Sequence, residues 1–126
     1  MHKLLGVFLF VHALGHAAGF AELTGFRHEG VFVTATLLAG TVPVGAAVAK
    51  TLGAAWLALG LGFGAASVAA AVRAPWMPGY AALLAVISLA LAVLCWPLSL
   101  VGVPMNGALL AMLVAAKHHG ALRDVG

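Results

Sequence analysis

The chain has 126 residues, of which 64% are hydrophobic and only 7% are charged. Soluble domains carry about 25% charged residues, so this composition excludes an ordinary water-soluble protein and predicts a single integral membrane domain over residues 1–126. The formal net charge of +3 comes from scattered basic residues, which argues against a nucleic-acid partner. With a single cysteine in the chain, an internal disulfide is excluded.

The first predicted element is a membrane-spanning helix over about residues 3–20. An uncharged run separates Lys3 from Glu22, and it is long enough for one span of about 27 Å. A cleaved signal peptide is the alternative. Histidines inside the apolar run, and the apolar character of the remaining chain, favour a span that is retained.

Two histidines lie within this span. His12 and His16 are four residues apart, so a helix places both imidazoles on one face, one turn apart. Ionisable side chains are costly in a membrane and often functional there. The pair could bind a divalent metal ion if other ligands join it, or it could be a neutral pair that is hydrogen-bonded inside the protein. Ala13 excludes the HExxH zinc-protease pattern. Haem is disfavoured because no histidine is expected to face the pair from another helix.

The sequence predicts an extracytoplasmic loop over residues 21–48. Its first part holds Glu22, His28 and Glu29 and must lie outside the hydrocarbon. Residues 31–44 are rich in threonine and β-branched residues with a turn signal at 40–43, which favours a short β-hairpin over a helix. A broken fifth span is the alternative, and counting basic residues on each side does not distinguish the two.

Three further apolar runs predict helices over about residues 49–72, 79–96 and 103–118. The middle run has Trp76 and Trp96 near its ends, as is typical of side chains at membrane interfaces. The predicted fold class is therefore an all-α membrane protein with a four-transmembrane-helix bundle. The positive-inside rule then places both termini in the cytoplasm, with the protein in a bacterial inner membrane.

Two glycine pairs predict close helix packing. Gly15 and Gly19 lie in the first span, and Gly60 and Gly64 lie in the second. Such GxxxG pairs let helix backbones approach closely in lipid. They serve contacts within the chain or, alternatively, contacts between copies of it.

The four-span topology gathers several polar residues toward the outer side of the membrane. Asn106 is expected to form an interhelical hydrogen bond or to join the histidine site. Ser88 is expected to be a packing residue that bonds to backbone, and Cys95 to fill apolar space. The candidate ligand residues are His12, His16, Asn106 and Glu22, with Cys95, His28 and Glu29 as further pocket residues.

Short motifs along the chain resemble those of a group of small bacterial membrane proteins that are loosely similar to the DoxX-like four-helix family. The resemblance implies a four-helix membrane protein with a loop after the first span, and it supplies no reaction. The connection after the third span is more apolar here than is usual in that group. The motifs are HALGH at residues 12–16, LGAAW at residues 52–56, Ser88, Trp96-Pro97, and GVPMN at residues 102–106.

These observations favour a membrane module that binds a ligand at the histidine pair. The ligand could be a metal ion or an amphipathic small molecule such as a quinone or a lipid. The alternatives are an accessory subunit of a larger membrane complex and a small transporter or channel. The expected partners are the lipid bilayer and either another membrane protein or a second copy. The cofactor is unknown, with a divalent metal as the candidate, and whether the chain is an enzyme stays open.

Overall fold

A computed structural model describes residues 2–23, 36–38, 40–96 and 99–118, and the structural statements below concern these residues. They form four helices in the order α1 (His2–Leu23), α2 (Ala46–Ala71), α3 (Met77–Leu94) and α4 (Gly102–His118). Between α1 and α2, the two-residue strands β1 (Thr36–Leu37) and β2 (Val42–Pro43) pair antiparallel, with Leu37 opposite Val42.

Three of the described helices, α1, α2 and α3, are long and apolar enough to span a membrane. With 17 residues, α4 is slightly shorter than the roughly 20 residues of a typical span. The outward faces of the helices carry large apolar side chains, for example Leu4 at 74% and Leu61 at 69% exposure. Such faces are unfavourable in water and suit acyl chains, so they indicate a membrane protein.

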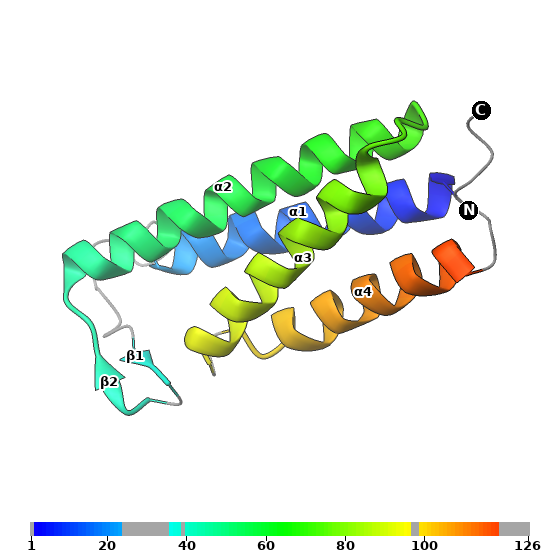
Figure 1. Cartoon of the computed structure of the whole chain (residues 1–126). Helices are drawn as coiled ribbons and strands as arrows, with labels where there is room; N and C mark the ends of the chain where they lie inside the picture. Colours follow the sequence, from blue (N-terminus) through cyan, green and yellow to red (C-terminus); the bar gives the residue numbers. More distant parts are fainter. Residues whose placement is uncertain (1, 24–35, 39, 97–98, 119–126) are drawn as a thin grey trace.

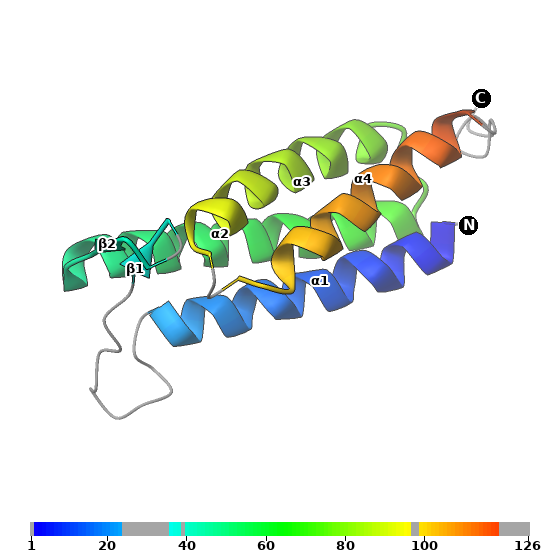
Figure 2. The same cartoon turned by 90° about the horizontal axis from the view of Figure 1, so that it is seen from below.

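The helices α1 and α2 lie side by side and antiparallel, and the hairpin of α3 and α4 packs against them (Figures 1 and 2). Consecutive described helices run in opposite directions, so the start of α1, the turn between α2 and α3, and the end of α4 lie at the same end of the protein (Figure 1). The hairpin of β1 and β2 lies at the opposite end.

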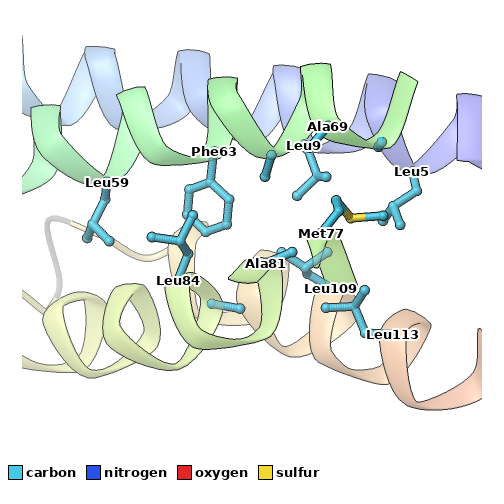
Figure 3. Packing of buried hydrophobic residues seen from close by; sticks show 13 residues of the cluster. Leu5, Leu9, Leu59, Phe63, Ala69, Met77, Ala81, Leu84, Leu109 and Leu113 are labelled. Carbon is cyan, nitrogen blue, oxygen red and sulfur yellow. The ribbon is translucent and has the colours of Figure 1, made fainter. Parts of the chain in front are cut away.

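All four helices contribute to one apolar core (Figure 3). Phe63 of α2 lies near the middle of this core and is fully buried. A second, smaller cluster joins Leu23, Trp56, Ala92 and Cys95. The loop is shorter than predicted, because α1 continues to Leu23 and α2 begins at Ala46. Leu23 is buried in this second cluster with Trp56 instead of lying in a polar loop, which accounts for the longer α1.

One glycine of each predicted GxxxG pair lies in a contact between helices, and the other faces open space. A Cβ atom at Gly60 would lie 3.1 Å from the Cβ of His16, and one at Gly19 would lie 3.0 Å from Cε3 of Trp56. These two glycines therefore permit the close approach of α1 and α2. A Cβ at Gly15 or Gly64 would meet nothing within 4 Å, so neither predicted GxxxG pair packs as a unit within the described chain.

Candidate functional site

Four buried polar side chains meet in the interior. Asn106 of α4 lies between His12 of α1, whose Nε2 is 3.1 Å from Asn106 Oδ1, and Ser88 of α3, whose Oγ is 2.8 Å from Asn106 Nδ2. The Ser88 Oγ is also 3.0 Å from His16 Nε2. None of the four residues is more than 5% exposed. Together they form an unbroken hydrogen-bonded chain, which we call the polar network, across three helices.

The orientation of Asn106 follows from a backbone contact. Its Nδ2 donates to the carbonyl oxygen of Gly102 at 2.8 Å, one turn earlier in α4. A carbonyl oxygen can only accept, so the amide nitrogen must face Gly102 and Ser88, and Oδ1 must face His12. Because Oδ1 also only accepts, His12 Nε2 carries a hydrogen and donates it.

The helix α2 contributes aromatic walls to the same site. The His12 ring centroid lies 4.5 Å from that of Phe63, nearly edge-on at 84°. The His16 centroid lies 4.7 Å from Trp56 and 5.2 Å from Phe63. Edge-on and offset ring contacts of this kind are favourable and fix ring orientation. The two imidazoles are themselves at 85° to each other, and each directs its Nε2 at a different partner.

A cavity of about 380 Å³ lies beside the polar network. Its walls come from α1, from Trp56 of α2, and from the start of α4 with the residues just before it. Val11 is 52% exposed and Val101 is 70% exposed, so the cavity reaches the outer surface between α1 and α4. The lining residues are Val11, His12, Gly15, His16, Ala18, Gly19, Glu22, Trp56, Ser99, Leu100, Val101, Gly102 and Met105.

His16 has one polar atom without a partner. Its Nδ1 is buried and makes no hydrogen bond among the described residues, although the residue is only 2% exposed. A buried unsatisfied polar atom costs about 1–3 kcal/mol and calls for an explanation. Because His16 lines the cavity, a bound molecule can supply the missing partner.

The structure brings together some of the predicted site residues and separates others. His12, His16 and Asn106 belong to the polar network, and Glu22 lines the cavity near the end of α1. Cys95 packs in the second apolar cluster and is not among the described residues that line the cavity. The remaining two candidates, His28 and Glu29, lie outside the described residues.

Two residues of the site differ from the prediction. Ser88 was expected to be a packing residue that bonds to backbone, and this is wrong because its hydroxyl joins His16 to Asn106 instead. Trp56 was not considered as a site residue, yet it lines the cavity and contacts the His16 ring. A signal was present in the sequence: Trp56 lies inside an apolar span, whereas Trp residues of lipid-facing helices gather at the ends.

The described residues provide no obvious ligand set for a metal ion. They contain no group of three or more His, Cys, Asp or Glu side chains that could hold one. Both Nε2 atoms are already in hydrogen bonds to Asn106 and Ser88, so a metal ion at these atoms would have to displace those bonds.

Searches for similar proteins found no matching family model, no matching curated protein and no matching solved structure. The resemblance to DoxX-like proteins therefore stays a prediction from the sequence, and the function must be argued from the site.

Proposed function

We propose that this chain is an integral membrane protein that binds a small amphipathic molecule in the cavity beside the polar network. The observation that carries the proposal is the buried, unpartnered Nδ1 of His16 in the wall of an otherwise largely apolar cavity. The cavity volume of about 380 Å³ is within the range of roughly 300–1,000 Å³ typical of small-molecule sites. Such sites combine apolar walls with a few polar groups that orient the ligand.

A lateral entrance supports a ligand that comes from the bilayer. The cavity reaches the surface beside Val11 and Val101, which lie on faces that suit acyl chains. A lipophilic molecule can then enter without crossing water. A metal ion fits the site less well, because both histidine Nε2 atoms already have partners.

The proposal includes a four-span topology in a bacterial inner membrane with both termini in the cytoplasm. The basic residues Lys3, Arg73 and Lys117 are at the end that the start of α1 shares with the end of α4, and Lys50 is at the other end (Figure 1). By the positive-inside rule, the end with more basic residues faces the cytoplasm. In this arrangement Glu22 and the hairpin of β1 and β2 lie on the outer side.

Filling the cavity tests the proposal. Gly15 lines the cavity and has no atom near its Cβ position, whereas Gly64 has equal room but does not line it. Gly15→Leu therefore places a side chain in the cavity, and Gly64→Leu is its matched control. Both are made with Trp76→Phe and Trp96→Phe, so that Trp56 is the one remaining tryptophan of three.

The probe is a bromoalkyl methyl ketone of about eleven carbons, because bromine quenches tryptophan fluorescence on contact. We expect saturable quenching of Trp56 in the protein that carries only the two Trp→Phe changes and in its Gly64→Leu variant. Quenching in the Gly15→Leu variant should be at least tenfold weaker. Equal quenching in all three proteins would show that the probe does not occupy the cavity, and it would overturn the proposal.

A further inference from the structure

The hydrogen-bond directions in the polar network determine which nitrogen of His16 carries the proton. The Asn106 amide nitrogen faces Ser88 because its other hydrogen goes to the carbonyl of Gly102. The Ser88 oxygen therefore accepts from Asn106. The hydroxyl hydrogen of Ser88 still needs an acceptor, since a buried donor without one is costly.

His16 Nε2 is the acceptor that the structure offers to Ser88. A serine inside a helix often donates to the carbonyl one turn earlier, but no such bond is present for Ser88 within the described chain. Among the described residues, its oxygen is hydrogen-bonded only to Asn106 Nδ2 and His16 Nε2. The amide nitrogen cannot accept. Ser88 therefore donates to His16 Nε2.

A neutral imidazole that accepts at Nε2 carries its hydrogen at Nδ1. The charged form of His16 would donate from both nitrogens and leave the Ser88 hydroxyl hydrogen without an acceptor. The neutral form with the hydrogen on Nδ1 satisfies every hydrogen bond within the network. The Nε1–H of Trp56, which also lines the cavity, is a buried donor without a hydrogen-bond partner among the described residues, and within the network the Nδ1–H of His16 is another.

From this donor we infer the chemical class of the ligand: an apolar molecule that presents a carbonyl oxygen, as a ketone or an ester, to His16 Nδ1. The inference rests on the proposed function, because it assigns chemistry to the same cavity. A carbonyl oxygen only accepts, so it pairs with the free N–H and leaves no hydrogen of its own unpaired. An alkane would leave Nδ1 unpaired. An alkylammonium would bring a second donor to it, although Glu22 also lines the cavity.

Three probes of equal length separate these ligand classes: the bromoalkyl methyl ketone, the matching bromoalkane and the matching bromoalkylammonium. Each probe is titrated in detergent against the variant with Trp76→Phe and Trp96→Phe, in which Trp56 is the remaining tryptophan. Probe concentrations are expressed per micelle. We expect the ketone to bind about tenfold more tightly than the alkane, in line with one net hydrogen bond. In Ser88→Ala, His16 is free to place its hydrogen on either nitrogen, so we expect this preference to fall to about threefold or less.

The outcomes distinguish this inference from the proposed function. If ketone and alkane quench Trp56 equally, and Gly15→Leu abolishes both, the cavity binds lipophilic molecules and the carbonyl inference is overturned. Tighter binding of the alkylammonium also overturns it, in favour of recognition by Glu22. If none of the three probes quenches, the proposed function itself fails.

A measurement without ligand tests the tautomer directly. The chain contains one Gly–His dipeptide, Gly15-His16, so labelling glycine carbonyls with carbon-13 and histidine with nitrogen-15 identifies the His16 signals in NMR spectra. We expect the proton on Nδ1 in lipid bilayers. A proton on Nε2 would overturn the inference even if every variant failed to fold.

The carbonyl could belong to an ester lipid of the bilayer or to a separate lipophilic compound. Adding a diester phospholipid or its diether analogue to the micelles separates the two sources. Displacement of the ketone probe by the diester alone identifies the bilayer lipid, and displacement by neither identifies a separate carbonyl compound. Equal displacement by both would contradict a requirement for a carbonyl.

Discussion

Asn106 is the residue that ties α4 to the histidines. Its side chain makes hydrogen bonds to His12, Ser88 and Gly102 while being fully buried. Hydrogen bonds between membrane helices average only about 0.6 kcal/mol each, but removing a residue with several partners also leaves those partners unpaired.

We therefore expect Asn106→Leu to lower the free energy of unfolding by about 2 kcal/mol. Unfolding in mixed micelles with increasing denaturing detergent measures this change. Met112→Leu, on the outer face of the same helix, is the control and should change stability by less than about 0.5 kcal/mol. A similar small effect from Asn106→Leu would mean that the polar network contributes little to the fold.

The proton on His12 Nε2 gives a second prediction at the residue scale. Because Asn106 Oδ1 must receive a hydrogen from His12, a glutamine amide at position 12 can replace the donor, whereas leucine cannot. We expect His12→Gln to retain stability to within about 1 kcal/mol and His12→Leu to lose about 1–3 kcal/mol. Equal losses, measured in the same unfolding experiment, would show that packing against Phe63 matters more than the hydrogen bond.

At the scale of a single helix, Arg73 lies in an unfavourable conformation. It follows α2 with φ at 56°, in the left-handed region that favours glycine. The Ala74 amide donates to the Ala69 carbonyl at 2.9 Å, and the Arg73 amide donates to the Ala70 carbonyl at 3.2 Å, which is the Schellman pattern of a helix end.

Since glycine is the usual residue at this position, we expect Arg73→Gly to raise the free energy of unfolding by about 1 kcal/mol. The thermal midpoint in detergent measures the change. Arg73→Ala removes the same charge but keeps the backbone strain, so it should give no gain. If both variants shift the midpoint equally, the charge and not the backbone is responsible.

The contact between α1 and α2 depends on one glycine of each predicted pair. Gly60 faces His16 Cβ at 3.1 Å and the Ala13 carbonyl oxygen at 3.2 Å, whereas Gly64 faces open space. Alanine favours a helix over glycine by roughly 0.5–1 kcal/mol. We therefore expect Gly64→Ala to stabilise the protein by up to that amount, and Gly60→Ala to lose the gain or reverse it, because the backbone of α1 must move. Equal stabilisation by both variants would contradict the close packing at Gly60.

The helices were easier to predict than the site they form. Apolar runs and their polar or proline-rich ends indicated all four helices, because hydropathy and helix-ending residues are local properties. The rotation of each helix is not local. His12 and His16 were recognised as a pair, but Ser88 as their partner depended on how α3 turns relative to α1, and weak amphipathicity in a membrane helix does not fix that rotation. Trp56 differs, because its position inside an apolar span was a local signal that the prediction did not use.

At the scale of the whole molecule, the arrangement of α4 decides how the site relates to the two sides of the membrane. The described helices alternate in direction, so the end of α4 lies at the same end as the start of α1 (Figure 2). The polar network holds α4 against the interior through Asn106, although α4 has only 17 residues. If α4 crosses the bilayer, the cavity beside its first turn is in the half of the membrane that lies away from the start of α1 and the end of α4.

Labelling of single cysteines tests this topology. Cys95 is buried and is the single cysteine of the chain, so Cys95→Ala gives a background without thiols. Lys3, Lys50 and Lys117 are exposed, and each is replaced by cysteine in turn. With a membrane-impermeant maleimide on intact bacterial spheroplasts, we expect Lys50→Cys to be labelled. Lys3→Cys and Lys117→Cys should react only after permeabilisation. Labelling of Lys117→Cys in intact spheroplasts, with Lys3→Cys protected, would mean that α4 does not cross and that three spans carry the site.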